Sequence, residues 1–142
     1  MKTINQILKS KSPEIYSVTR KTSVFDALTV MMNKNISALL IMENDVLLGI
    51  FSERDYARKI ILQGKSSRET SIDDVMTKDL ITISQHDSVD HCMQLMTDKH
   101  IRHLPIVDNG TVLGLISIGD IVKSVIEDQK QTIEQLQSYI HS

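Results

Sequence analysis

The chain has 142 residues, 41% of them hydrophobic, and its 18 acidic residues against 16 lysines and arginines give a formal net charge of −2. A chain of this length and composition can bury one compact core or two small coupled ones, and it is too apolar to be disordered. Because there is no basic surplus, we expect neither a nucleic-acid partner nor a membrane partner.

The cysteine content and the first residues indicate a compartment. Cys92 is the single cysteine, so an internal disulfide cannot form, as is usual in a reducing environment. Residues 1–14 lack the apolar run of a signal peptide, and no stretch approaches the roughly 18 uninterrupted apolar residues of a membrane span. We therefore expect a cytoplasmic protein.

The chain repeats itself with an offset of 65 residues, the feature that organises the rest of the sequence. Residues 15–61 align with residues 80–126 without a gap, and apolar positions match throughout. The predicted units are a first repeat at 1–62, a linker at 63–70, a second repeat at 71–126 and a C-terminal helical extension at 127–142.

In chain order, the first repeat predicts a helix, a strand, a helix and two further strands. A short amphipathic helix begins at Thr3, and a strand follows near 15–18. Ser23, a residue typical of helix N-caps, precedes a helix whose apolar side chains recur on one face. Two apolar runs at 38–42 and 46–51, separated by a polar turn, indicate a hairpin.

The second repeat predicts the same order from Ser71 onward. Its hairpin turn contains Asn109-Gly110, a pair that favours tight turns between strands. Cys92 falls on the apolar face of a helix, so we expect it in the core. The last helix of each repeat begins after a serine, Ser52 or Ser117.

A glycine, a serine and an aspartate recur at the junction before each last helix. GIFSERD occupies 49–55 and GLISIGD occupies 114–120. A serine followed three residues later by an acid is also a capping box, in which the two side chains satisfy free backbone amides. Because the Ser71 to Asp74 pair shows the same spacing where no ligand is expected, spacing alone leaves capping and ligand binding both open.

These residues carry a family resemblance that covers nearly the whole chain. The gapless repeat, the paired motifs and the HLPIVDNGTVLGLISIGDI stretch at 103–121 resemble a tandem pair of cystathionine-β-synthase (CBS) domains. GIFSERDYARKIILQGKSSRET followed by DDVMT is similar to the small stand-alone CBS-pair proteins. The resemblance implies an α/β (α+β) fold: two strand-helix-strand-strand-helix motifs related by pseudo-two-fold symmetry, with an extended C-terminal helix.

The resemblance also implies a ligand. The cleft between the two motifs would bind an adenosine compound, namely AMP, ADP, ATP, NAD(H) or S-adenosylmethionine, and no catalytic cofactor. Asp120 would accept hydrogen bonds from the ribose hydroxyls, and Ser117 would contact ribose or phosphate. The backbone amides at the start of the following helix would face a phosphate. Strand residues Ile83, Ser84 and Pro105 complete the expected second site around the adenine.

The two repeats differ in their basic residues. Arg102 and His103 precede Leu104, whereas the first repeat has Ser37 and Ala38 at the matching positions. In related modules, basic residues at this place contact phosphates, so we expect the second site to bind phosphate better. An exposed charge for Arg102 and a half-buried imidazole for His103 are the alternatives.

The first repeat carries matching candidates in Ser52 and Asp55, and an arginine of its own. Arg54 stands at the helix start where the second repeat has Gly119. Since pseudo-symmetry brings the starts of the two last helices to a common cleft, we expect Arg54 to serve the opposite site and to favour a diphosphate or triphosphate.

Catalysis and metal binding have weak support. The group His86, Asp87, Asp90 and His91 could ligate a metal, but it lies at a helix start, where acidic residues favour the helix dipole. No serine or cysteine nucleophile comes with a recognisable base and orienting acid. We therefore expect no enzyme activity and no metal.

The C-terminal helix carries a heptad stripe. Its members recur at steps of four and three and are Val122, Ile126, Gln129, Ile133, Leu136 and Ile140. Packing on its own chain and packing on a partner helix both satisfy the pattern, and we favour a homodimer contact.

The leading hypothesis is a regulatory module, a homodimer that senses adenine nucleotides and modulates an unidentified protein. The alternative is a structural or oligomerisation adaptor with a vestigial nucleotide cleft.

Overall fold

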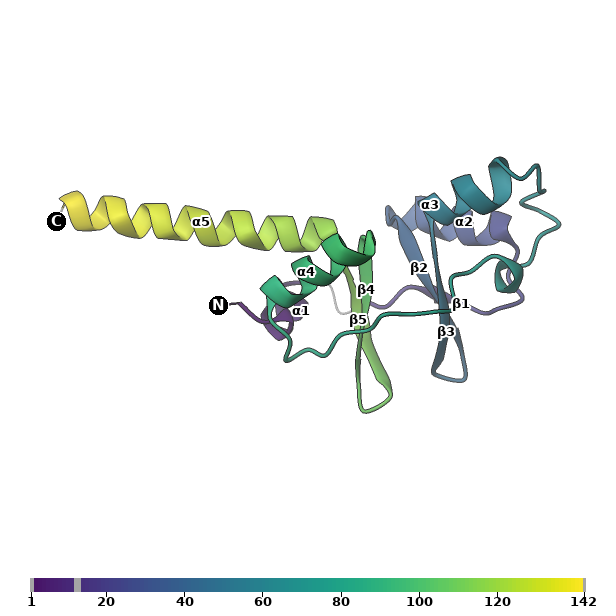
Figure 1. Cartoon of the computed structure of the whole chain (residues 1–142), viewed down its shortest axis with the longest axis horizontal. Helices are drawn as coiled ribbons and strands as arrows, with labels where there is room; N and C mark the ends of the chain where they lie inside the picture. Colours follow the sequence, from purple (N-terminus) through teal and green to yellow (C-terminus); the bar gives the residue numbers. More distant parts are fainter. Residues whose placement is uncertain (1, 12–13, 142) are drawn as a thin grey trace.

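Residues 2–11 and 14–141 are described by a computed structural model of the chain. Two globular halves lie side by side, and a long helix projects from the second half away from the first (Figure 1). The chain begins with α1 (Ile4–Ser10), β1 (Ser17–Val18), α2 (Val24–Lys34), β2 (Ala38–Glu43), β3 (Val46–Ser52), α3 (Glu53–Asp55) and the π-helical turn η1 (Tyr56–Ile61). It continues with the 3₁₀ turn η2 (Ile72–Asp74), α4 (Val89–Lys99), β4 (His103–Asp108), β5 (Thr111–Ser117) and α5 (Ile118–His141).

The structure confirms the tandem repeat and the mixed α/β fold. Helix α2 and strands β2 and β3 recur as α4, β4 and β5, and each begins and ends 65 residues later. The two hairpins lie side by side with their turns on the same side of the molecule (Figure 1). Each hairpin has an irregularity at the same place, after Ile41 and after Ile106.

Local sequence signals place the helix starts and the turns correctly. The hydroxyl oxygens of Ser23 and Ser88 accept hydrogen bonds from the backbone amides three residues later, each at 3.0 Å, and so cap α2 and α4. The turn after β4 contains Asn109 and Gly110, both with positive φ, as a tight hairpin turn between twisted strands requires.

Three expected elements are shorter than the sequence predicts, and the first is the strand at 15–18, which is reduced to Ser17–Val18. Ser71 does not cap a helix, because its hydroxyl donates to the carbonyl of Arg20 at 2.9 Å and η2 is a single turn. The strand expected at 80–83 is reduced to one bridge between Ile83 and Ile106. In the first half, the Leu40 amide donates to the strand beside it; the matching residue is Pro105, which has no N–H to donate.

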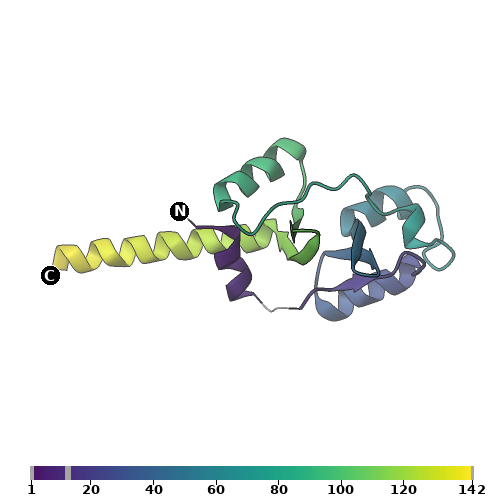
Figure 2. The same ribbon diagram turned by 90° about the horizontal axis from the view of Figure 1, so that it is seen from below.

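Each half is completed by the segment that precedes the other repeat. Ile4 and Ile7 of α1 are buried in the core of the second half together with Cys92, and Figure 2 shows α1 beside α5. Ile72 and Met76 are buried in the core of the first half. Because a buried isoleucine contributes about 1.5–3 kcal/mol, this exchange couples the two halves. The sequence repeats therefore differ from the packing units.

The glycine of each repeated motif lies where an exchanged segment approaches a hairpin. A Cβ on Gly49 would lie 2.8 Å from the carbonyl oxygen of Thr77 and 2.7 Å from the sulfur of Met76. Thr77 is paired with Ile50 through two backbone hydrogen bonds, so its carbonyl cannot move away from a new Cβ without weakening them. A Cβ on Gly114 would meet only a methyl group of Leu8, at 3.1 Å.

Replacing these glycines tests the close approach. We expect Gly49→Ala to lower the free energy of unfolding by about 1–3 kcal/mol, since a backbone carbonyl must shift. Gly114→Ala is expected to cost about 1 kcal/mol or less, because a leucine side chain can turn aside. Urea unfolding of both variants measures the difference, and equal losses would contradict this account.

Candidate functional site

A cavity of about 570 Å³ lies between the two halves. Residues 14–16, just before β1, and residues 35–38, which lead into β2, form one wall, and β5 with the start of α5 forms the other. The side chains of Ile15, Ile36 and Leu115 give it apolar walls, and Ser117, Asp120, His103 and Lys11 supply polar groups. Pockets of this size and mixed lining are typical of small-ligand sites.

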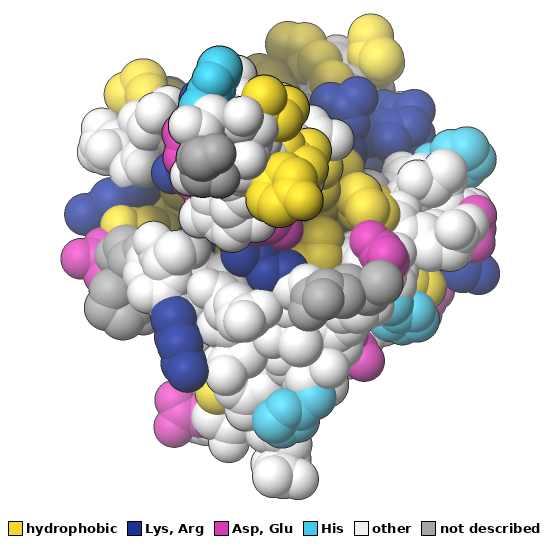
Figure 3. Space-filling view, turned by 90° about the vertical axis from the view of Figure 1, so that its left-hand side faces the viewer, with side chains coloured by type: hydrophobic (Ala, Val, Ile, Leu, Met, Phe, Trp, Pro, Cys, Tyr) yellow, Lys and Arg dark blue, Asp and Glu magenta, His cyan; other side chains and the backbone are white. Residues whose placement is uncertain are grey.

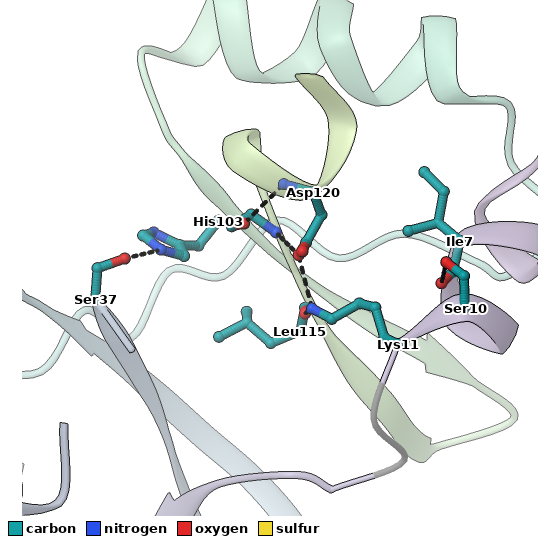
Figure 4. A network of polar contacts seen from close by, with 8 residues as sticks. Ile7, Ser10, Lys11, Ser37, His103, Leu115 and Asp120 are labelled. Carbon is teal, nitrogen blue, oxygen red and sulfur yellow. Dashed lines mark hydrogen bonds and ion pairs between the residues drawn. The ribbon is translucent and has the colours of Figure 1, made fainter. Parts of the chain in front are cut away.

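Asp120 is held in a fixed orientation at the start of α5. Its Oδ2 accepts from the backbone amide of Ser117 at 2.9 Å, and its own amide donates to the Ser117 hydroxyl at 3.1 Å. The same Oδ2 accepts from the Lys11 ammonium at 2.6 Å, and Lys11 also donates to the carbonyl of Leu115 at 2.8 Å (Figure 4). The capping interpretation of the motif is therefore confirmed, and the capped carboxylate also lines the cavity.

The ion pair keeps Asp120 charged. Burial by itself would raise the pKa of this carboxyl. The hydrogen bonds from Lys11 and Ser117 and the positive charge of Lys11 outweigh burial, so the pKa lies below its ordinary value. At neutral pH the cavity therefore contains a carboxylate, which accepts the strong hydrogen bonds of hydroxyl donors.

His103 joins the two halves across the cavity. Its Nε2 lies 2.9 Å from the hydroxyl oxygen of Ser37 at the start of the first hairpin (Figure 4). Burial lowers the pKa of the imidazole, and the positive charges of Lys11 and Arg102 add to this lowering, which the negative charges of Asp120 and Asp55 oppose. The half-buried, neutral imidazole can serve as a hydrogen-bond donor or acceptor.

Both carboxylate oxygens of Asp55, the counterpart of Asp120, are engaged by residues packed in the first half. Its Oδ2 accepts from the Ser52 amide at 3.0 Å and from the Ser52 hydroxyl at 3.1 Å. Its Oδ1 accepts from the Thr77 hydroxyl at 3.2 Å and pairs with Lys59 at 3.3 Å. Neither Ser52 nor Asp55 lines the cavity, so the structure does not bring the two aspartates to one site.

Both candidate arginines lie outside the cavity lining. Arg54 reaches the second half, as pseudo-symmetry predicts, but its guanidinium donates to the carbonyl of His100 at 3.1 Å. Arg102 is exposed, and the carbonyl of Arg102 accepts from the amide of Ile118 at 2.8 Å.

The strand residues expected around adenine also lie elsewhere. The backbone amide and carbonyl of Ile83 both bond to β4, and Pro105 is buried. The amide of Ser84 donates to Asp87 at 2.8 Å. None of the three lines the cavity. Instead, Ile15 and neighbouring first-half residues line the cavity together with Asp120.

Lys11, Ile15 and Tyr16 are cavity residues that the sequence did not single out. No motif marks Lys11, which lies at the end of α1 and reaches Asp120 only because α1 packs into the second half. A strand near 15–18 was expected, but the sequence did not indicate that residues 14–16 would line a cavity together with Asp120 at the start of α5.

Other reactive groups are poorly placed for chemistry. Cys92 is fully buried, and burial, with the negative charge of Asp87, raises the pKa of its thiol to about 11. Across residues 2–11 and 14–141, no three His, Cys, Asp or Glu side chains gather as a metal site would require. No helix in the same ranges is both long and apolar enough to cross a membrane.

Comparisons with known proteins agree with the fold. A family model for the CBS domain matches residues 6–62 and 72–127. CBSX3, a mitochondrial CBS domain-containing protein of Arabidopsis thaliana, is 39% identical over 147 residues, covering 97% of this chain and 71% of that protein. A solved protein with CBS domains from Burkholderia ambifaria MC40-6 is 48% identical with a TM-score of 0.87, covering 90% of this chain and 96% of that chain.

A further solved structure of similar fold is a complex with adenosine ligands. The CBS domain pair of the protein MJ0100, in complex with 5′-methylthioadenosine and S-adenosyl-L-methionine, is 26% identical to this chain with a TM-score of 0.78. The match covers 87% of this chain and 99% of that one.

The lowered pKa of His103 predicts a pH-dependent stability. The unfolded chain takes up a proton near pH 6.5, the ordinary histidine value, whereas the folded chain does so only at lower pH. The contribution of His103 is therefore fully present above that value and is lost as pH falls through the folded pKa. Urea unfolding of the wild type and His103→Gln should differ more at about pH 7 than at about pH 5; a constant difference would contradict the expectation.

Proposed function

The chain belongs to the CBS-domain family as a tandem pair, and on that premise we propose that it is a regulatory module whose cavity binds an adenosine compound. The single observation that carries this proposal is Asp120, an oriented carboxylate that lines a cavity between the two halves. A ribose diol presents two hydroxyl donors, and a carboxylate offers two acceptor oxygens to match them.

The remaining lining fits the other parts of such a ligand. The apolar side chains of Ile15, Ile36 and Leu115 offer flat contact to an adenine ring. The start of α5 lines the cavity at Asp120, so the positive end of the helix dipole would stabilise a phosphate there. The adenosine ligands named for the MJ0100 pair support the same compound class. AMP, ADP, ATP and NAD(H) are the candidates for this chain.

We infer one competent site rather than two. Both oxygens of Asp55 are engaged by Ser52, Thr77 and Lys59, whereas Asp120 has hydrogen bonds to one oxygen only among the described residues. A ligand would have to break more interactions to reach Asp55.

We infer binding rather than turnover. Ser37 and His103 form a serine and histidine pair in the cavity, but among the described residues no carboxylate bonds the second ring nitrogen of His103 to orient it as a base. Regulation would follow if the ligand binds one arrangement of the two halves more tightly than another. The regulated protein and a cytoplasmic location stay predictions; the Arabidopsis relative is named as mitochondrial.

Paired substitutions test the site. Asp120→Asn keeps the side-chain volume and one acceptor oxygen but removes the charge, so we expect it to weaken AMP or ATP binding by about tenfold or more. Asp55→Asn is the matched control and should leave affinity nearly unchanged. Isothermal titration calorimetry and ligand-induced shifts in unfolding temperature measure both. If no adenine nucleotide binds the wild type, the adaptor hypothesis replaces this proposal.

We also propose that the chain forms a homodimer through α5. The stripe residues Ile126, Ile133, Leu136 and Ile140 are between 47% and 73% exposed. Figure 3, which faces the C-terminal end of α5, shows hydrophobic side chains gathered on one side of the helix. A second copy of this chain is the occupant that we infer, because a heptad stripe is complementary to itself and α5 extends well past the folded half.

Charge placed on the stripe tests the dimer. Leu136→Asp would bury a carboxylate between the two helices, so we expect a monomer by size-exclusion chromatography with light scattering. Gln135→Asp adds the same charge one position away from the stripe and should leave the dimer intact. A monomeric wild type, or a Leu136→Asp variant that stays dimeric, would rule out this interface.

A further inference from the structure

Lys11 is the one lysine or arginine among the described residues that line the cavity. Two carboxylates, Glu14 and Asp120, line it as well, and burial lowers the pKa of His103 so that the imidazole is neutral near neutral pH. The charge of the cavity therefore depends on Lys11. Without it, an anionic ligand would meet two negative side chains and no fixed positive one.

The position of Lys11 is well defined by its neighbours. It follows the last turn of α1, whose residues Ile4 and Ile7 are buried in the second half. Its ammonium is shared between the Asp120 carboxylate at 2.6 Å and the Leu115 carbonyl at 2.8 Å. The side chain is 31% exposed, so the charge is only partly solvated and needs a counter-ion.

The first half shows a different arrangement of the same kind of ion pair. Lys59 lies on the same helical segment as Asp55, four residues later, and also donates to the carbonyl of Val75 at 2.9 Å. The position that matches Lys59 in the second half is Ser124, whose buried hydroxyl has no hydrogen-bond partner among the described residues. The cation beside Asp120 therefore comes from a separate segment, and it can leave the carboxylate while α5 stays in place.

The consequence for a ligand follows from charge balance. A ribose diol that bonds to both oxygens of Asp120 either displaces the Lys11 ammonium from Oδ2 or shares that oxygen with it. An uncharged nucleoside offers the displaced ammonium no replacement, so part of an ion pair is lost. A 5′-phosphate supplies the missing negative charge on the same ligand, and ammonium to phosphate bonds are among the stronger hydrogen bonds.

We propose that Lys11 is the specificity-determining residue of this cavity, which selects adenosine compounds that carry a phosphate over uncharged ones. The inference rests on the proposed function, since it concerns the ligand of the same site. Lys11 pairs with Asp120 in the empty cavity and with the ligand phosphate in the occupied one.

The test compares two probes that differ only in the phosphate. AMP and adenosine are titrated calorimetrically into the wild type, Lys11→Met, Lys11→Arg and Lys9→Met. Lys9 is an exposed lysine on the same helix and does not line the cavity, so Lys9→Met removes an equal charge without touching the site. Thermal unfolding of each variant establishes that it is folded.

We expect the wild type to bind AMP more tightly than adenosine. Lys11→Met should lower the ratio of AMP affinity to adenosine affinity by about tenfold or more, whereas Lys11→Arg and Lys9→Met should keep it. An equal loss of affinity for both probes in Lys11→Met would assign Lys11 a structural role and overturn the inference. An equal gain of affinity for both probes would mean that Lys11 only competes with the ligand for Asp120, and this result would also overturn the inference. A wild type that binds neither probe overturns the proposed function itself.

Discussion

The exchange of N-terminal segments between the two halves is the packing interaction on which the other features depend. Helix α1 completes the second core and the 72–76 segment completes the first, so neither half has a full core alone. Gly49 and Gly114 permit this packing because each lies where an exchanged segment approaches a hairpin. The cavity is a product of the exchange, since it brings residues 14–16 and Lys11 to the start of α5.

The same residues that begin α5 also form the candidate site. Ser117 and Asp120 satisfy each other's backbone amides and thereby fix the carboxylate before any ligand arrives. Capping and ligand binding are thus compatible uses of one motif, because all the hydrogen bonds that Asp120 accepts from the described residues go to Oδ2. An oriented acceptor loses less conformational entropy on binding than a mobile one.

The pseudo-symmetry of the fold does not extend to the chemistry of its two carboxylates. Asp55 is closed in by Thr77 and by Lys59 of its own helical segment. Asp120 pairs instead with Lys11 at the end of α1, and the hydroxyl of Ser124, one turn later on α5, has no hydrogen-bond partner in residues 2–11 and 14–141. The duplicated sequence therefore holds one carboxylate that is engaged on both oxygens within the first half and one that lines the cavity, and the change from Lys59 to Ser124 at matching positions contributes to the difference.

The sequence by itself determined the repeat, the hairpins, the caps of α2 and α4, the buried Cys92 and the motif that presents Asp120. These depend on periodicity and on contacts between residues a few positions apart, which a linear pattern records. It also contained, in Pro105, the reason why the second half loses its first strand. Only the tertiary structure decided which half each N-terminal segment completes, that Lys11 pairs with Asp120, and that Ile83, Ser84, Pro105 and Arg102 lie away from the cavity. Those outcomes depend on how segments distant in the sequence pack together, as with Lys11 and Asp120, which are 109 residues apart, and spacing along the chain carries no information about such distances in space.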